Sequence, residues 1–334
     1  MGGLILAGLS LMQFNPGKPL QAQAAAHRKR TLHADRIALG MAASAASFFM
    51  LNTMNVFAKL LSPHHSVIEV AFYRNLIAAL PFAVWFSLPG HRERLKIYGR
   101  PGTIVLRSVI GTVSLVATFK AFNALPMADA QALFFTSSLF VPVMGYLFLK
   151  EFVGPYRWSA VIVGFLGMLV IVRPSGAVNL TGVSFAVGAA FMHATLGTLL
   201  RVLGRTERPE TVTFYFLAIG TALTALAMPF VATVPAWHEV PYFLGAGISG
   251  AFAQVFLSMA YKYAPMALVT IFNYTGIVWA TAYGWFIWGD WPGAPVWTGA
   301  GIIIASSLFI VWRENRMAKL ARLLGPAPTA SGSG

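Results

Sequence analysis

An arginine inside an apolar stretch is the feature of this sequence with the clearest chemical consequence. Arg74 stands eight residues into the stretch 66–88, which is long enough to cross a bilayer. On a helix that rises 1.5 Å per residue, its Cα is about 12 Å below the helix end. A charge at that depth is costly without a partner. Arg74 therefore either binds a substrate carboxylate or bonds neighbouring groups and holds the helices together.

Three further polar residues lie inside apolar stretches. His193 could bind substrate or carry a proton, because the pKa of a free imidazole is about 6.5, or it could bond a neighbouring helix. Gln254 and Asn273 carry amides, which within a membrane either bind a ligand or join helices. All three are candidate site residues.

Asn52, Asn55 and Lys59 follow each other at i, i+3 and i+7, so they share one helix face. A polar stripe of this kind predicts a wet cavity, and we include both asparagines in the site. Arg107 and Lys120 lie near the ends of their stretch, where long cationic side chains reach the membrane surface, and we expect both to do so.

Aromatic residues on the same stretches could form the wall of an apolar cavity or pack between helices. The candidates are Phe72, Tyr73, Phe119, Tyr261, Tyr274 and Trp279.

The composition is that of a membrane protein. Hydrophobic residues make up 57% of the 334 residues and charged residues 10%, against about 25% charged in soluble domains. The net charge of +14 fits basic cytoplasmic loops better than a nucleic-acid partner, because the charges do not gather on one segment. The chain has no cysteine, so disulfides and Cys-ligated metals are excluded. We expect no metal and no cofactor.

Ten apolar segments are each close to the ~20 residues that a membrane-spanning helix needs. They are 36–60, 66–88, 103–121, 127–149, 157–173, 180–201, 211–234, 240–262, 266–288 and 295–312. Most of the 24 Lys and Arg residues fall on one side of this arrangement, the side of both termini. The positive-inside rule therefore predicts cytoplasmic tails at 1–34 and 314–334.

The stretch 124–171 recurs at 263–310, shifted by 139 residues without a gap. Pro126, Thr136 and Glu151, for example, are matched by Pro265, Thr275 and Asp290. Self-similarity at a fixed offset indicates a duplicated unit.

Five helices per unit make the second unit enter the membrane upside down. We therefore predict an all-α membrane protein of ten transmembrane helices, built as two inverted five-helix repeats, 35–174 and 175–313, around a central cavity. We expect one copy to suffice for function.

The chain resembles the drug/metabolite transporter superfamily, and its EamA-type exporters in particular. The residues that carry the likeness are Glu69 with Ala71-Phe72-Tyr73-Arg74, and Pro126-Met127-Ala128 with Glu151. Asp290 departs from the glutamate usual in the second copy. The resemblance implies a basket-like fold, a bacterial inner-membrane location and export of small metabolites.

We expect from this a secondary transporter, not an enzyme, that exports aromatic and other neutral amino acids. Uptake or exchange of a nucleotide derivative or S-adenosylmethionine is the alternative. Phosphorylated substrates would need several deep cations, and only Arg74 qualifies. An intramembrane serine protease is the rival class, because Gly247-Ile248-Ser249-Gly250 matches its motif, but no His follows Ser249 to activate it.

Overall fold

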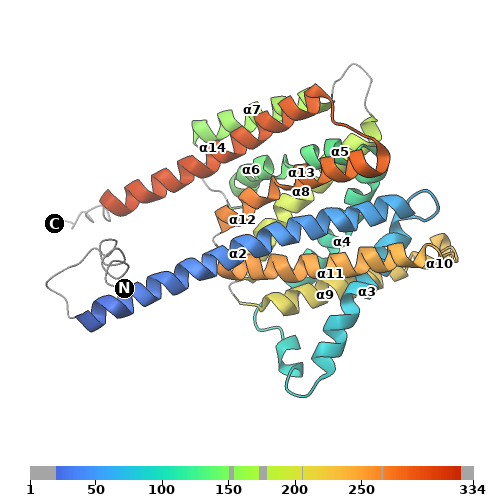
Figure 1. Cartoon of the computed structure of the whole chain (residues 1–334), viewed down its shortest axis with the longest axis horizontal. Coiled ribbons are helices and arrows are strands. Elements are labelled where there is room, and N and C mark those ends of the chain that lie inside the picture. The colour runs from blue at the N-terminus through green and yellow to red at the C-terminus, as the bar shows by residue number, and fades with distance from the viewer. Residues whose placement is uncertain (1–19, 150–153, 173–178, 205, 265, 325–334) are drawn as a thin grey trace, which may run out of the picture.

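The computed structural model describes residues 20–149, 154–172, 179–204, 206–264 and 266–324, and in these it contains helices and no strand (Figure 1). The elements are α2 (Leu20–Leu61), α3 (Val67–Ser87), η1 (Arg92–Leu95), α4 (Pro101–Ala124), α5 (Met127–Phe134), α6 (Ser137–Leu149), α7 (Pro155–Val172), α8 (Leu180–Leu203), α9 (Pro209–Ala225), α10 (Met228–Val231), α11 (Val240–Tyr263), α12 (Met266–Asn273), α13 (Gly276–Tyr283), the π-helical η2 (Gly284–Trp288) and α14 (Ala294–Leu324).

Six helices in the described part of the chain are long and apolar enough to cross a membrane, which makes this a multi-pass membrane protein. They lie in α2, α3, α4, α8, α11 and α14. Three predicted spans are not single helices: 127–149 is divided into α5 and α6, 211–234 into α9 and α10, and 266–288 into α12, α13 and η2. Among the described residues the first helix is α2, which runs from Leu20 in the predicted tail into the first predicted span without a break.

The helix starts follow local chemistry. Ser66 caps α3 by accepting a hydrogen bond from the Ile68 amide (3.3 Å), and the Asn179 side chain accepts one from Gly182 at the start of α8 (3.1 Å). Pro101 and Pro209 begin α4 and α9, where the missing N–H costs nothing. The starts of α3, α4, α8 and α9 are therefore fixed by residues that the sequence places there.

Helices far apart in the chain pack side by side. The most extensive contacts join α2 to α11, α4 to α8 and α7 to α14, and α3 packs on both α9 and α11 (Figure 1). Glycine permits the closest approach: a Cβ on Gly299 would lie 2.5 Å from the Gly167 carbonyl oxygen, and one on Gly40 would lie 2.7 Å from the Ala264 nitrogen. The small residues let these backbones touch, as is common within membranes.

Two of the helices are broken at equivalent places. Between α5 and α6 the Thr136 hydroxyl donates to the Leu133 carbonyl (2.7 Å), and between α12 and α13 Thr275 donates to the Phe272 carbonyl (2.6 Å). Thr136 and Thr275 are 139 residues apart, the offset of the duplication. A side-chain hydroxyl that donates to a carbonyl of the preceding turn competes with the regular backbone hydrogen bonds of the helix. At both breaks, backbone N–H groups bond the carbonyl three residues earlier, which tightens the turn.

The two breaks meet in the middle of the molecule. The rings of Phe135 and Tyr274, again 139 residues apart, contact each other edge to face with centroids 5.1 Å apart. Phe135 belongs to the largest buried apolar cluster, which also contains Leu139, Ile277 and Ile303. The core thus lies where the two copies of the duplicated stretch touch.

Candidate functional site

A cavity of about 330 Å³ lies beside the helix breaks and is lined by α2, α3, α4, α5, α6, α8, α9, α11 and α12. This volume is at the small end of the range for ligand sites, which run from about 300 to 1,000 Å³. Six predicted site residues line it: Asn52, Asn55, Arg74, His193, Gln254 and Asn273. The polar residues that were predicted from the sequence as site candidates therefore line one cavity.

Arg74 is buried on α3 and reaches this cavity. Its Nη1 donates to the Asn75 Oδ1 (2.7 Å) and its Nε to the Met54 sulfur (3.2 Å). No carboxylate of the described residues lies within ion-pair distance of it; Glu69 instead pairs with His65. The charge of Arg74 is therefore held by neutral partners only.

Arg107 is a second buried cation at the same site. Its side chain is 7% exposed and lines the cavity, so the expectation that it reaches the membrane surface is wrong. The reason is a ring from α9: the Arg107 guanidinium lies 4.1 Å from the centroid of Phe216, and that of Arg74 lies 5.9 Å from the same centroid. The argument against phosphorylated substrates, which assumed a single deep cation, falls with this correction.

Phe216 cannot neutralise two charges. A cation–π contact contributes about 0.5–2 kcal/mol, whereas removing an ion from water costs several kcal/mol. Arg107 also has an Nε and an Nη1 with no hydrogen-bond partner among the described residues. The pair of arginines is therefore a site of uncompensated positive charge.

Hydrogen-bonding groups without partners continue along the cavity from these arginines. Four buried oxygen atoms have no hydrogen-bond partner among the described residues: Asn52 Oδ1, Asn55 Oδ1, Ser114 Oγ and Thr118 Oγ1. Such atoms are rare in proteins and call for a ligand or water. Sequence reasoning missed the two hydroxyls, because serine and threonine are too common within membrane helices to stand out.

His193, on α8, projects into the cavity, where its ring is accessible and contacts Phe134 edge to face at 5.9 Å between centroids. Gln131, on α5, also lines the cavity and was not predicted. Gly276 is packed against it, since a Cβ there would lie 2.6 Å from the Gln131 Nε2. Glycine thus lets α13 approach the site.

The aromatic residues that line the cavity differ from the predicted ones and include Phe48, Phe134 and Phe216. Of the six aromatic candidates, the five with described side chains line no part of the cavity: Phe72, Tyr73, Phe119, Tyr274 and Trp279. They fill gaps between helices instead; Tyr73 packs on Phe243 (4.9 Å between centroids) and Trp279 on Phe49 (4.8 Å). The side chain of Tyr261 lies outside the described residues.

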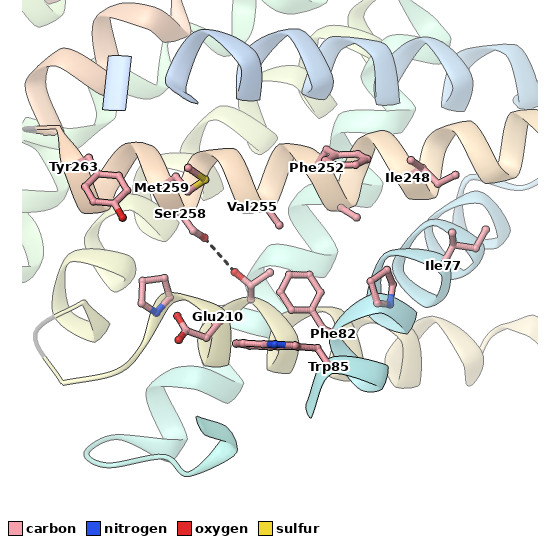
Figure 2. Close-up of a pocket in the computed structure, with 14 residues that line it drawn as sticks. Ile77, Phe82, Trp85, Glu210, Ile248, Phe252, Val255, Ser258, Met259 and Tyr263 are labelled. Atoms are coloured by element: carbon pink, nitrogen blue, oxygen red, sulfur yellow. Dashed lines mark hydrogen bonds between the residues drawn. The ribbon is translucent and has the colours of Figure 1, made fainter. Parts of the chain in front are cut away.

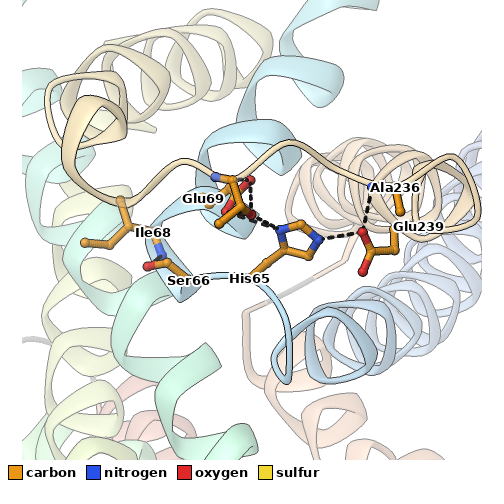
Figure 3. A network of polar contacts seen from close by, with 7 residues as sticks. His65, Ser66, Ile68, Glu69, Ala236 and Glu239 are labelled. Atoms are coloured by element: carbon orange, nitrogen blue, oxygen red, sulfur yellow. Dashed lines mark hydrogen bonds and ion pairs between the residues drawn. The ribbon is translucent and has the colours of Figure 1, made fainter.

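A polar network at one end of the molecule joins the α2–α3 loop to the segment before α11 (Figure 3). In this His65 network, His65 lies between Glu69 (3.2 Å) and Glu239 (3.0 Å), and Thr233 contacts both His65 and Glu69. His65, Glu69 and Glu239 are all buried. The backbone N–H of Ala236 and the bond from His65 lower the pKa of the Glu239 carboxyl.

A second polar contact holds two other loops together. The Glu207 carboxylate accepts hydrogen bonds from the backbone N–H groups of Tyr98 (3.1 Å), Gly99 (2.7 Å) and Arg100 (3.4 Å). Burial alone would raise the pKa of Glu207, but these donors and the Thr206 side chain lower it. In this Glu207 clamp the α3–α4 loop is bound to the α8–α9 loop.

A larger groove of about 540 Å³ lies between α3, α9 and α11 (Figure 2). Its walls are mostly apolar, and Ile248 and Phe252 on its edge are about half exposed. It therefore opens on the apolar surface that a membrane protein presents to lipid. The central cavity, with its unpaired polar atoms, is the better candidate for a solute.

A model of the EamA-like transporter family matches the chain twice, over residues 38–173 and 180–312. The chain belongs to the EamA-like transporter family. This confirms the resemblance to the drug/metabolite transporter superfamily. The first match ends directly after α7, and the second begins with α8.

Curated relatives cover most of this EamA-like chain. It is similar to a riboflavin transporter of Rhizobium johnstonii (31% identity over 84% of this chain and 92% of the relative). It is also similar to the pseudopaline exporter CntI of Pseudomonas aeruginosa (28%, 82% and 96%) and an S-adenosylmethionine uptake transporter of Rickettsia prowazekii (27%, 78% and 88%). A solved crystal structure shares the fold with a TM-score of 0.56 at 16% identity, over 82% of this chain and 99% of that one.

These EamA-like relatives are named as transporters, which makes this chain a member of a transporter family whose substrates are small molecules. The rival protease motif gains no support in the structure. The Ser249 hydroxyl donates to the Gly245 carbonyl of its own helix, and not to a base that could activate it.

Proposed function

We propose that this protein is a secondary transporter that moves a small organic metabolite by alternating access between two inverted five-helix halves, 35–174 and 175–313. The observation that carries the proposal is the position of the cavity, which is lined by both halves beside two helices broken at equivalent residues. Discontinuous helices at the repeat interface are typical of the substrate sites of such transporters.

The packing pattern supports the inverted repeat. Exchange of the halves pairs α2 with α8, α3 with α9, α4 with α11, α5–α6 with α12–α13 and α7 with α14. Under this exchange the α2–α11 contact becomes the α8–α4 contact, and α3–α11 becomes α9–α4; all four are present. The contacts α3–α9 and α7–α14 each become themselves. A two-fold axis that lies in the membrane plane accounts for this set of contacts.

The two polar contacts between loops obey the same relation. The exchange turns the α2–α3 loop into the α8–α9 loop, and the segment before α11 into the α3–α4 loop. The His65 network therefore becomes the Glu207 clamp, on the opposite membrane face. With both termini cytoplasmic, as the basic residues favour, the His65 network closes the outer side and the Glu207 clamp the inner side.

The relatives differ in the substrate and in the direction of transport that their names give, since one is named an exporter and another an uptake transporter. Our expectation of aromatic amino acids depended on six aromatic side chains, and the five that the structure describes do not line the cavity. Amino-acid export therefore stays one candidate among small metabolites, next to compounds of the kinds that the relatives are named for.

Counterflow in proteoliposomes tests the proposal. The purified full chain is loaded with one unlabelled compound and offered the same compound labelled, for a panel of amino acids, organic acids, phosphate esters, riboflavin and S-adenosylmethionine. Transient accumulation of one class above that in protein-free vesicles is expected. Exchange of none of these compounds by a folded protein would contradict the proposal.

Gly250 offers a first mutational test. A Cβ at this position would lie 2.7 Å from the Arg74 Nε and 3.1 Å from its Nη2, so Gly250→Ala displaces the guanidinium. We expect counterflow to fall about tenfold, since a shift of a binding group by an ångström or less is enough for a loss of that order. The matched control is Gly188→Ala on α8, where a Cβ meets nothing within 4 Å; equal losses in both variants would refute the explanation.

A further inference from the structure

We propose that the cavity selects organic anions. In this proposal the acidic group of the substrate, a carboxylate or a phosphate, binds between Arg74 and Arg107, and its uncharged part offers hydrogen-bond donors to Asn52 and Asn55. That the bound anion is also transported rests on the proposed function. The binding site itself is argued from the charges and the unpaired atoms below.

The charges that line the cavity have one sign. Its described lining contains Arg74 and Arg107 but no aspartate, glutamate or lysine. The nearest buried carboxylate on α3, Glu69, is engaged by His65 and Thr233. A cationic ligand would meet two like charges with nothing to offset them, and the ammonium of a zwitterion would find no carboxylate. A ligand of net negative charge supplies what the site lacks.

The two guanidiniums line the same cavity and contact the same aromatic ring. Both lie within 6 Å of the Phe216 centroid, and this ring is itself held against α4, where a Cβ on Gly111 would lie 2.8 Å from the ring. The Nε and Nη1 of Arg107 have no partner among the described residues. Both nitrogens carry N–H groups that can give charge-assisted hydrogen bonds to carboxylate or phosphate oxygens.

The asparagines accept hydrogen bonds. The Asn52 Nδ2 donates to the Phe48 carbonyl (2.8 Å), which leaves the Asn52 Oδ1 as the free atom of that amide. The Asn55 Oδ1 is buried and unpaired as well. A bound molecule therefore needs N–H or O–H groups away from its acidic end, as a hydroxy acid, an amide or a sugar phosphate has.

Binding to the purified full chain tests the charge preference without transport. Unfolding midpoints are measured in detergent with succinate, succinamate and succinamide, which share a skeleton and carry two, one and no negative charges, and with phosphoserine against serine. We expect an anionic member of at least one series to raise the midpoint by several degrees and its uncharged or zwitterionic relative to leave it unchanged. No shift with any anion, or a larger shift with succinamide or serine, would overturn the proposal.

Variants then locate the site. Arg107→Gln is expected to abolish the anion-induced shift and to lower counterflow of anions at least hundredfold. The ligand-free midpoint should not fall, because the change removes a buried charge that no carboxylate among the described residues offsets. Arg107→Lys keeps the charge without the paired donors and should recover part of the loss. Arg92→Gln, on the exposed loop before α4, removes one positive charge elsewhere and should behave as the wild type.

Three outcomes separate this inference from the proposed function. Anion binding that Arg107→Gln removes, together with counterflow of anions, supports both. Anion binding without any counterflow leaves the anion site standing and contradicts transport. Counterflow of amino acids or S-adenosylmethionine that Arg107→Gln does not change supports transport and overturns the anion site.

Discussion

A disulfide between α6 and α14 should stop transport completely. The hydroxyl oxygens of Ser138 and Ser307 are 2.6 Å apart, so Ser138→Cys together with Ser307→Cys places two sulfurs at bonding distance. Ser138 belongs to the broken helix of the first half and Ser307 to the last helix of the second. If the halves rock against each other, the oxidised protein is locked in one conformation and counterflow falls to the level of protein-free vesicles.

The measurement compares oxidised and reduced samples of the same double variant, and reduction should restore exchange. The wild-type chain has no cysteine, so no other disulfide can form. Thr213→Cys with Ser258→Cys is the matched control, because these hydroxyls are 3.5 Å apart on α9 and α11, both in the second half. Full exchange by the crosslinked Ser138–Ser307 pair would show that the halves do not move apart there.

The residues that could be predicted from sequence are those for which lipid permits only one solution. An arginine or an amide within a membrane helix must turn towards protein or water, whatever the neighbouring helices are. Arg74, Asn52, Gln254 and Asn273 were therefore placed at the cavity without knowledge of the packing.

The residues that could not be predicted are those whose place depends on helix rotation and on distant partners. Phe119 is equally stable in lipid and in a protein core, so its position follows only from packing, and it is buried beside α2. Arg107 was judged by its distance from a helix end, whereas its position is determined by Phe216, more than 100 residues later in the chain.

The helix breaks lie between these extremes. No proline or glycine occurs at 135–137, so composition predicted an unbroken span. The second break has Gly276 next to its threonine, but the signal that both breaks share is the threonine at 136 and 275, which a duplication preserves for many reasons. Its hydrogen bond to the preceding turn becomes evident only in the structure.

The two loop contacts should act in opposite directions. We expect Glu239→Gln to weaken the His65 network and to favour a cavity open to the outside, because the carboxylate accepts from His65 Nε2 (3.0 Å) and from the Ala236 N–H (2.8 Å). Glu207→Gln should weaken the Glu207 clamp and favour a cavity open to the inside. Hydrogen bonds to charged groups are strong enough to shift such an equilibrium roughly tenfold.

Labelling of a cysteine in the cavity measures this. Ser114→Cys introduces the single thiol of the chain at a buried, unpaired position of the cavity, and a membrane-impermeant maleimide is added outside oriented vesicles. Labelling should be about tenfold faster with Glu239→Gln and slower with Glu207→Gln than in the parent. Changes of the same sign in both variants would contradict the assignment of the two contacts to opposite faces.

The pH dependence has a definite sign. The pKa of Glu239 is lowered in the folded protein, so its contribution is complete above the ordinary glutamate pKa, about 4.3, and is lost as the pH falls through the lowered value. His65, Glu69 and His238 are the titratable groups around it. Acidifying only the outer solution to below about pH 4 should therefore bring the labelling rate of the parent towards that of Glu239→Gln at the same pH, because the protonated carboxyl then resembles the uncharged glutamine. The two proteins are compared at each pH because the thiolate that reacts with maleimide becomes scarcer in both as the pH falls.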